Sequence, residues 1–447
     1  MSGVGLPSPG ARRLRLWALC VLALVVLGWA VWLPSAYPSS SLLYKFGADR
    51  FMLIGGKMAG AALLFIMAAQ LVLVARPAFL ERAAGLDRLV AWHRFVGAAV
   101  VVLAVVHPLL VFAPEDVAAM PLQWEYWPEV LGVGLLISLA LSGVLSWWRR
   151  YAKLPYHLWK AAHFLGAPAL LTGSLVHVYF VTDSFHSGQP LWFLIFVGVV
   201  SLVSWGWVAA KKLLGGGVHV VDRVVTAGPS AREIHLKPEG APILHEPGQF
   251  AVLHPMQRPL GGEAHPFTIA SGAGEDALRF VIRCSGDWTA QVGALKPGDR
   301  IRVDGPLGLF SPAAFDKAPV VCIAGGVGAT PMLSMIRSMT SDSPPLHFIW
   351  ANRTTDDVFN ADELTALQEE LPQLRVSHVF TREREPDAPA MVGRLGKSVL
   401  KELLGNSVVK DQRYFVCGPP EMMATVARHL RELGADPSRI VMEEFGF

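Results

Sequence analysis

The stretch WHRFVGAAVVVLAVVHP, residues 92–108, is an apolar run with a histidine near each end. His93 and His107 are 14 positions apart. Fourteen helical residues turn through about 1400°, roughly 40° short of four full turns. Both imidazoles therefore lie on one helix face, about 21 Å apart along the axis. Ionisable side chains are rare in membrane-spanning helices and are usually functional there. The segment is consequently predicted to be a membrane helix with two functional groups.

A second segment, HFLGAPALLTGSLVH at 163–177, repeats this spacing with His163 and His177. Two such helices running side by side in the same direction would present two facing pairs, one at each of two depths. Neutral imidazole is a standard axial ligand of haem iron, and helix bundles hold cofactors between facing side chains. We therefore predict two bis-histidine b-type haems, one between His93 and His163 and one between His107 and His177. The alternative is that these histidines form interhelical hydrogen bonds or a proton relay.

The apolar half of the chain ends near Lys212 and contains six segments long enough to cross the ~30 Å hydrocarbon core as helices. These segments are 16–34, 52–75, 89–113, 130–148, 157–181 and 190–210. The first is apolar from Leu16 to Leu33. That is longer than the apolar core of a signal peptide, about 7–15 residues, so we expect it to remain as a membrane span.

Charged side chains in the loops predict the orientation of these spans. Basic residues lie before the first span, in the second and fourth loops and after the sixth span: Arg12, Arg13, Arg15, Arg76, Arg82, Arg88, Arg149, Arg150, Lys153, Lys211 and Lys212. The third loop lacks them and carries Glu115, Asp116, Glu125 and Glu129. The positive-inside rule then places both termini in the cytoplasm and His93 and His163 nearer that side. We expect a multi-pass protein of the cell (inner) membrane, embedded in the lipid bilayer.

Beyond Val218 the pattern changes to short strands separated by turn residues, as in REIHLKP (232–238) and LRFVIRC (278–284). This pattern predicts a small antiparallel β-barrel. The following stretch, APVVCIAGGVGATPMLSMIR at 318–337, is an apolar strand, a glycine-rich turn and a helix. Glycines let the backbone approach a pyrophosphate, and the helix N-terminus offers it free N–H groups. A doubly wound α/β nucleotide-binding domain is therefore predicted.

The expected fold class is a multidomain membrane protein. It would consist of a six-helix transmembrane bundle (1–213), an antiparallel β-barrel domain (214–313) and a doubly wound α/β domain (314–447). The formal net charge of +3 gives no case for nucleic-acid binding. Four singly scattered cysteines argue against a disulfide framework and a plant-type iron–sulfur cluster.

Together these features resemble the NADPH oxidase/ferric reductase family, in particular its compact bacterial members. The resemblance covers roughly residues 50–447. Besides the paired histidines, the motifs that carry it are HPFTIAS (265–271), GGVGATP (325–331), CGPP (417–420) and an aromatic residue at the end, Phe447. The soluble half is similar to the ferredoxin-NADP reductase superfamily within that family.

The resemblance implies a set of FAD contacts. The flavin ring and ribityl chain would be held by His265, Pro266, Phe267 and Thr268, with the Thr268 hydroxyl nearest the reactive N5. The diphosphate and adenine side would be contacted by Arg283, Trp288 and Thr289. Phe447 would stack on the flavin and move aside for hydride transfer. The alternative for Phe447 is an ordinary frayed terminus.

The resemblance also implies the nucleotide site. The phosphate loop would comprise Gly325, Gly326, Gly328, Thr330 and Pro331. Cys417, Gly418 and Pro419 would lie beside the nicotinamide, although a cysteine alone is equally a buried small hydrophobic residue. Arg353 follows a strand that ends without an acidic residue, so it favours the 2′-phosphate of NADPH. Asp356 and Asp357 follow closely, which leaves NADH open.

The predicted function is to pass electrons from cytoplasmic NADPH through FAD and two haems to an external small-molecule acceptor. With both axial positions filled, the outer haem would reduce its acceptor without coordinating it, which suits O2 going to superoxide and equally a chelated ferric ion. We expect an oxidase, with a ferric-chelate reductase as the alternative. A quinone or a docked extracytoplasmic protein is a second redox hypothesis, although no obligate protein partner is evident. A transporter with a nucleotide-sensing soluble half is a third, and it predicts no haem.

Overall fold

A computed structural model describes residues 6–114, 124–148, 151, 156–257, 260–315, 318–383, 390–405 and 410–444. The chain divides into two compact units, Gly10–Leu214 and Gly215–Phe447, the latter together with Met1–Pro9. Several residues used above lie outside the described ranges, namely Glu115, Asp116, Arg149, Arg150, Lys153 and Phe447.

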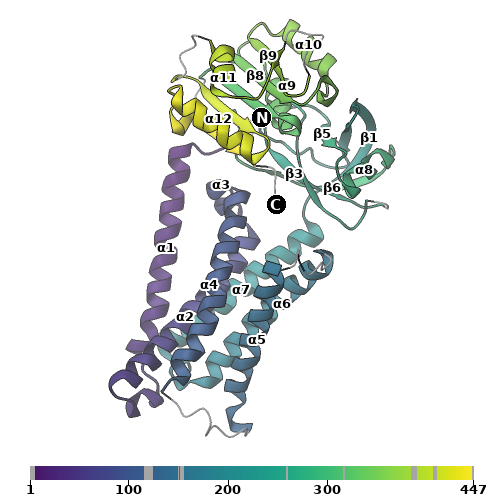
Figure 1. The fold of residues 1–447 in the computed structure, drawn as a ribbon. Helices are drawn as coiled ribbons and strands as arrows, with labels where there is room; N and C mark the ends of the chain where they lie inside the picture. Colours follow the sequence, from purple (N-terminus) through teal and green to yellow (C-terminus); the bar gives the residue numbers. More distant parts are fainter. Residues whose placement is uncertain are drawn as a thin grey trace. The chain divides into compact units, whose positions relative to one another are not determined.

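The first unit is a bundle of long helices (Figure 1). They are α1 (Pro9–Ala36), α2 (Gly47–Ala75), α4 (Leu86–Phe112), α5 (Trp127–Trp148), α6 (Tyr156–Val181) and α7 (Gly188–Leu214), with a short α3 (Ala78–Ala84). Without water in the bilayer, a helix is the element that satisfies all its backbone groups internally. Six helices of the described chain are long and apolar enough to cross a membrane, and each predicted span overlaps one of them. The multi-pass prediction is therefore confirmed.

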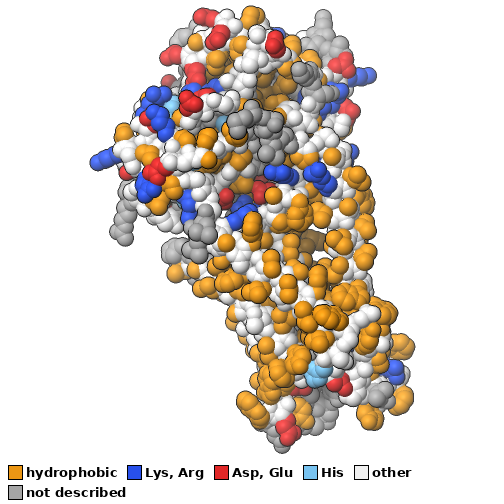
Figure 2. Space-filling model, turned by 180° about the vertical axis from the view of Figure 1, so that it is seen from behind, with side chains coloured by type: hydrophobic (Ala, Val, Ile, Leu, Met, Phe, Trp, Pro, Cys, Tyr) orange, Lys and Arg blue, Asp and Glu red, His pale blue; other side chains and the backbone are white. Residues whose placement is uncertain are grey.

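Apolar side chains cover the bundle on the outside as well as filling its centre. Figure 2 shows hydrophobic side chains gathered over these helices. Phe95 and Leu202 are each more than two-thirds exposed, which suits a surface solvated by lipid. Inside, α2 packs against α4 and α7, and α5 packs against α6. The buried cluster includes Leu64, Leu71 and Phe193.

Glycines set how closely these helices approach one another. A Cβ added at Gly56 of α2 would lie 2.7 Å from Val111 of α4, and one at Gly173 of α6 would lie 2.9 Å from Leu135 of α5. Small residues at helix contacts allow the close packing that drives association in lipid. The helix axes are therefore near enough for backbone carbonyls of one helix to meet side chains of the next.

The second unit begins with an antiparallel sheet that curls on itself. Its strands are β1 (Gly217–Gly228), β2 (Ala231–Pro238), β3 (Phe250–Pro255), β4 (His265–Thr268), β5 (Leu278–Arg283) and β6 (Arg300–Leu307), in the order β4-β3-β6-β1-β2-β5. After β4 the Ala270 N–H donates to Arg279 O at 2.7 Å, which brings the two edges of the sheet together. A cluster that includes Ile234, Phe280 and Val303 fills the inside.

The remainder is a parallel sheet covered on both faces. Its strands are β7 (Val320–Gly325), β8 (Leu346–Asn352), β9 (Leu374–Phe380), β10 (Met391–Val392), β11 (Arg413–Cys417) and β12 (Ile440–Glu443), in the order β10-β9-β8-β7-β11-β12. The helices are α9 (Thr330–Arg337), α10 (Ala361–Glu370), α11 (Lys397–Leu404) and α12 (Pro420–Glu432). Separate hydrophobic clusters lie on the two faces. The strand order reverses between β7 and β11, and a ligand crevice is expected where their carboxyl ends meet.

Candidate functional site

The four membrane histidines lie in two facing pairs between α4 and α6. The ring centroids of His93 and His163 are 6.2 Å apart, with an angle of 85° between the ring planes. Those of His107 and His177 are 6.4 Å apart, with an angle of 82°. The equal spacing on two helices therefore produces two pairs at two levels, as expected from the sequence.

These distances fit a single iron atom between the rings of each pair. A metal–imidazole bond is about 2.0 Å long, and the ring centroid lies about 1.2 Å behind the ligating nitrogen. Two imidazoles on opposite sides of one iron therefore have centroids about 6.4 Å apart. Edge-to-face rings in direct contact span about 4.5–7 Å, so the interpretation rests on the same separation recurring at two levels between the same two helices. Each pair therefore has a separation that would accommodate one iron atom between its rings.

A turn of α2 forms the environment of His107. Its Nδ1 lies 2.8 Å from the backbone carbonyl oxygen of Gly56. Gly60, one turn later, leaves room for the ring, because a Cβ there would lie 2.9 Å from Nδ1. A nitrogen that faces a carbonyl oxygen carries the proton, so Nε2 keeps its lone pair for a metal.

A turn of α5 forms a similar environment for His177. Its Nδ1 lies 2.7 Å from the backbone carbonyl oxygen of Pro128. Gly132, again four residues later, would place a Cβ only 2.7 Å from the Cε1 of the ring. We call His107 and His177 the outer pair, and His93 and His163 the inner pair, after their predicted sides of the membrane. Each ring of the outer pair is therefore oriented by a carbonyl and accommodated by a glycine four residues further along a neighbouring helix. Sequence reasoning missed these groups, and the recurring glycines of the second and fourth spans were their only signal.

The inner pair has a different environment. The Nδ1 of His163 lies 3.4 Å from the Ser142 hydroxyl of α5, and the Trp159 ring stacks on the imidazole at 5.4 Å. The Nδ1 of His93 is buried, and in the described part of the chain it has no hydrogen-bond partner. The side-chain amide of Gln70 in α2 donates to the backbone carbonyl of His93 at 3.0 Å.

The predicted FAD residues gather along β4 and the short helix α8 (Asp287–Ala290). The Trp288 ring lies 4.4 Å from His265 and stacks on Phe267 at 5.6 Å. Pro266 and Thr268 lie on the same strand, in register with β3, and Thr268 is buried at its end. The structure therefore joins two motifs that are about twenty residues apart in the sequence into one aromatic wall.

Two other predicted FAD contacts are occupied by protein partners. The Thr289 hydroxyl accepts the backbone N–H groups of Ser285 and Gly286 at 3.0 and 2.9 Å, which orders the turn before α8. Arg283 pairs with Asp357 of the α/β domain at 3.2 Å. The Arg283 guanidinium also lies near the phosphate loop, 3.6 Å from where a Cβ of Gly326 would be.

The predicted phosphate loop joins β7 to α9 and is packed too tightly for side chains. A Cβ at Gly328 would lie 2.5 Å from the backbone oxygen of Cys417. Gly326 has φ +55°, a conformation that favours glycine. The Thr330 hydroxyl donates to Val327 O at 3.0 Å, and Pro331 follows it in the first turn of α9. The loop and the start of α9 therefore lie at the crevice between β7 and β11.

The CGPP motif ends β11 at that crevice, where Pro419 precedes α12. Cys417 is fully buried, and burial together with the charge of Glu443 raises the pKa of its thiol, which is therefore neutral at physiological pH. Glu443 lies opposite Cys417 in the pairing of β11 with β12 and is itself buried. Sequence reasoning missed this carboxylate, because only the parallel pairing of two distant strands places it there.

Arg353 is exposed directly after β8. Its neighbour Asn352 is buried, and within the described residues neither polar atom of its side chain has a partner. Nearby, Glu383 accepts the Thr355 N–H at 2.7 Å and the Thr355 hydroxyl at 3.0 Å. This edge of the sheet therefore carries charges of both signs.

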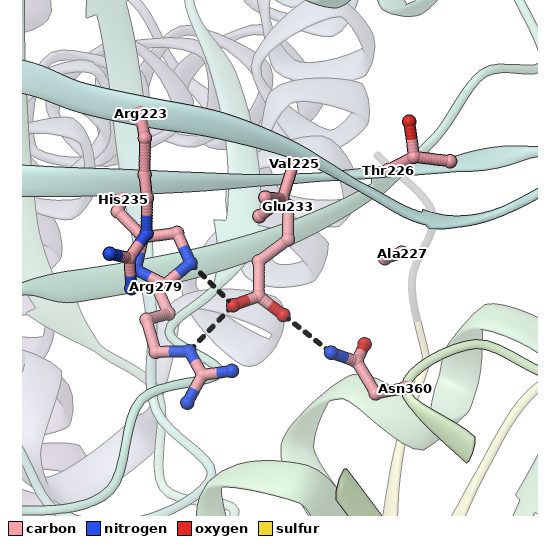
Figure 3. Close-up of a pocket in the computed structure, with 8 residues that line it drawn as sticks. All are labelled: Arg223, Val225, Thr226, Ala227, Glu233, His235, Arg279 and Asn360. Atoms are coloured by element: carbon pink, nitrogen blue, oxygen red, sulfur yellow. Dashed lines mark hydrogen bonds and ion pairs between the residues drawn. The ribbon is translucent and has the colours of Figure 1, made fainter. Parts of the chain in front are cut away.

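A buried ion network joins the curled sheet to the α/β domain, and it borders a pocket of about 440 Å³ (Figure 3). Glu233 of β2 is 1% exposed. It meets Arg279 at 2.6 Å and His235 at 2.8 Å. Asn360, which precedes α10, donates to it at 2.8 Å. The lining residues are Arg223, Val225, Thr226, Ala227, Glu233, His235, Arg279 and Asn360. None of them was predicted as a site residue.

The same network extends into the helices of the α/β domain. Arg337 of α9 contacts Glu233 at 3.2 Å and Glu363 of α10 at 2.6 Å. Burial alone would raise the pKa of Glu233, yet hydrogen bonds from His235 and Arg279 outweigh it and hold the pKa well below its usual range. We interpret the network as a structural connection that fixes the two domains of this unit to each other.

Comparison with known protein families gives three matches along the chain. Residues 59–174 match the ferric reductase like transmembrane component, residues 224–296 match an FAD-binding domain, and residues 322–428 match the oxidoreductase NAD-binding domain. Three of the paired histidines lie within the matched region of the bundle, and His177 lies just beyond its end. The FAD motifs lie within the second match and the nucleotide motifs within the third.

Individual relatives cover the chain only in part. The reductase component of propane 2-monooxygenase from Mycolicibacterium smegmatis is 30% identical over 46% of this chain and 63% of its own length. A flavohemoprotein from Rhodopirellula baltica is 27% identical over 52% of this chain and 61% of its own length. The chain therefore covers less than two-thirds of these relatives.

Solved structures show low sequence identity. The FAD/NAD-binding domain of a nitric oxide dioxygenase from Vibrio cholerae covers 52% of this chain and 99% of its own, with 23% identity and a TM-score of 0.46. A flavohemoglobin from Malassezia yamatoensis covers 89% of this chain and 98% of its own, with 17% identity and a TM-score of 0.48.

The fold and the three family matches define the class of protein as a transmembrane flavin oxidoreductase. A ferric reductase-like membrane component followed by FAD-binding and NAD-binding domains is the architecture of the ferric reductase/NADPH oxidase family. The family resemblance seen in the motifs is thereby confirmed.

Proposed function

We propose that this protein is a flavocytochrome that oxidises NADPH in the cytoplasm and delivers single electrons to O2 on the other side of the membrane. The observation that carries the proposal is the pair of histidine–histidine separations, 6.2 and 6.4 Å, inside a ferric reductase-like membrane component. Hydrogen-bonding or proton-relay histidines need no such repeated separation at two levels.

The proposed ligands are His93 with His163 for one b-type haem and His107 with His177 for the other. When bound, FAD accepts a hydride from the nicotinamide and releases electrons singly, and haem iron carries single electrons. The protein supplies the positions of these groups. Its carbonyl-bonded outer imidazoles are fixed in the tautomer that leaves Nε2 free for iron.

In the soluble unit, the flavin would lie along β4 against the Phe267–Trp288 wall, with the Thr268 hydroxyl at the ring. The nicotinamide would enter beside Cys417 and Gly418. Gly418 has φ +152°, and a Cβ added there would meet Met422 and the Gly325 backbone, so glycine fits this position. Because the Cys417 thiol is buried and neutral, it would add no negative charge near the nicotinamide that could hold the oxidised, cationic ring.

The phosphate loop would hold the dinucleotide through backbone groups. Gly325 and Gly328 let the loop pack closely against the CGPP segment, and the N-terminus of α9 would offer N–H groups to a pyrophosphate. Arg353 is exposed at the end of β8 and would reach a 2′-phosphate, which is why we favour NADPH.

The acceptor is inferred from the ligand set. If His107 and His177 both ligate the outer haem, its iron would have no free position, and an acceptor would take an electron without binding it. O2 reduced to superoxide meets this requirement and needs no docking surface. The loop charges support an outward direction of electron flow, with both termini in the cytoplasm.

The test uses full-length protein in liposomes with NADPH supplied to the soluble unit. We expect cytochrome c on the far side to be reduced and superoxide dismutase to suppress that reduction. Reduction that is insensitive to the dismutase would overturn O2 as the acceptor and favour direct reduction of a metal chelate or protein. Purified protein that binds FAD but contains no haem would overturn the whole electron path.

A further inference from the structure

In each of the four histidines proposed to bind haem, the ring orientation and the basicity of the ligating nitrogen depend on what the other ring nitrogen contacts. A hydrogen bond from Nδ1–H to an acceptor fixes the ring orientation and raises the basicity of a ligating imidazole. Three of the four rings have such an acceptor: Gly56 O for His107, Pro128 O for His177 and Ser142 Oγ for His163. His93 is the exception in the described part of the chain, since its buried Nδ1 has no partner there.

The side-chain amide of Gln70 contacts the same residue, His93. Its Nε2 donates to the backbone carbonyl oxygen of His93 at 3.0 Å, which assigns the nitrogen and oxygen of the amide. The amide oxygen, Oε1, is buried and has no partner among the described residues. His93 therefore has a ring nitrogen without an acceptor, and Gln70 has an amide oxygen without a donor. The two residues are already joined by the hydrogen bond to the His93 carbonyl. Buried polar atoms are rarely left unpaired, because each such atom costs about 1–3 kcal/mol.

The backbone around Gln70 leaves room for its amide. Gly97 follows His93 by one turn of α4, and a Cβ there would lie 3.3 Å from Gln70 Nε2. Gly97 therefore leaves room for the Gln70 amide, as Gly60 leaves room for the His107 ring. The terminal torsions of glutamine and histidine are broad, so both the amide and the ring can turn about them.

We propose that Gln70 is the positioning residue of the inner haem ligand: its amide oxygen accepts the Nδ1–H of His93 when Nε2 binds iron. The inference rests on the proposed function, because it requires His93 to be an iron ligand. In this proposal a side-chain amide sets the basicity of His93, whereas backbone carbonyls set that of His107 and His177. An acceptor on Nδ1 stabilises the ferric state, so its loss raises the reduction potential of that haem.

The experiment is a redox titration of full-length purified protein, followed in the haem absorption bands. Gln70→Leu removes the acceptor, and we expect both haems to be retained. One midpoint should rise by about a tenfold change in the reduction equilibrium, ~59 mV for one electron. Gln70→Glu supplies a stronger acceptor and should lower the same midpoint. Opposite shifts from the two variants are not expected of a residue that merely packs.

Ser201→Ala is the matched control, because it removes another buried polar group, a hydroxyl that donates to Val197 in its own helix. It should leave both midpoints unchanged. Unchanged midpoints in both Gln70 variants, or shifts in the same direction, would overturn the inference while leaving the proposed function intact. If Gln70→Leu loses a haem, Gly97→Ala is measured instead, because its methyl group would press on the Gln70 amide. A smaller rise of one midpoint would support the inference, and wild-type midpoints would overturn it. Wild-type protein without haem would overturn the proposed function itself.

Discussion

Gly60 and Gly132 show how single residues shape the membrane unit. Each leaves the space that an imidazole ring fills, and each follows by one helical turn the carbonyl that the same ring contacts. A methyl group at either position would meet a ring that is held between two helices. These glycines therefore matter through what they leave open, not through backbone conformation.

Gly132→Ala is predicted to disrupt the outer histidine pair. The new methyl would lie 2.7 Å from His177 Cε1, so the ring must move and lose its alignment with His107. We expect the haem content to fall from two per chain to about one, because metal sites tolerate misplacement of a ligand poorly. The pyridine haemochrome assay measures this ratio, and anaerobic reduction of the flavin by NADPH should stay near the wild-type rate.

Gly134→Ala is the matched control for this prediction. It lies two residues further along α5, and a Cβ there has no heavy atom within 4 Å. It should keep two haems per chain. Two haems with an unchanged spectrum in Gly132→Ala would contradict the assigned role of His177.

A second prediction at the residue level concerns the phosphate loop. A Cβ in Gly328→Ala would lie 2.5 Å from Cys417 O and 2.9 Å from Gly418 Cα, both backbone atoms that cannot yield easily. Displacing the loop should raise the KM for NADPH roughly tenfold, about 1.4 kcal/mol of binding. Stopped-flow measurement of flavin reduction tests this. Gly240→Ala, with open space around it, should leave the KM unchanged, and a wild-type KM in Gly328→Ala would count against this loop as the dinucleotide site.

At the level of elements, the Glu233 network connects strands β2 and β5 to helices α9 and α10. Removing the carboxylate from such a buried network is costly, because the charged groups that donated to it are left without compensation. The network therefore makes the curled sheet and the α/β domain of this unit depend on each other for stability. Its pocket in Figure 3 lies beside these ion pairs and not beside the predicted cofactor residues.

Glu233→Gln is predicted to destabilise the soluble unit by roughly 3 kcal/mol at neutral pH. The folded pKa of Glu233 is held below its usual range. Its contribution is therefore present above the unfolded pKa of about 4.3 and is lost as the pH falls further. The difference between wild type and variant should accordingly shrink in acid. Thermal release of FAD fluorescence from the full-length protein at several pH values measures it.

Glu239→Gln provides the comparison for the Glu233 variant. Glu239 pairs with Arg300 at the surface, where both side chains are more than a third exposed. Exposed ion pairs contribute little, so this variant should melt like wild type at every pH. An equal loss of stability in both variants would contradict the special role of the buried network.

At the level of the whole molecule, the loop charges predict a direction across the membrane for the proposed electron flow. The basic loops predict that the turn between α6 and α7 faces outward, and that the soluble unit lies in the cytoplasm. Donor and acceptor then stay on opposite sides, and a membrane-spanning path is needed to connect them.

Cysteine labelling in intact cells tests this sidedness. Ser187→Cys, in the exposed turn before α7, should react with a membrane-impermeant maleimide without permeabilisation. Ser285→Cys, exposed in the FAD-binding part, should react only after the membrane is opened. Both serines are exposed in their own units. The reverse pattern would place NADPH oxidation outside and contradict the proposed function.

The sequence by itself determined the elements and the pairing of the histidines. A 14-residue spacing on a helix is a local property, so it fixes which face His93 and His107 share before any packing is known. Likewise, apolar segments of about 20 residues define spans, and a strand, glycines and a helix in succession predict a phosphate loop. Each of these patterns concerns neighbours along one element.

Only the tertiary structure decided what surrounds those groups. The carbonyls of Gly56 and Pro128, the amide of Gln70 and the carboxylate of Glu443 each come from a different helix or strand than the residue they serve. Likewise, Arg283 and Thr289, predicted to face FAD, bond to Asp357 and to their own turn. Such contacts depend on how closely two elements approach and in what register. That depends on side chains packed across the interface, which no local pattern records.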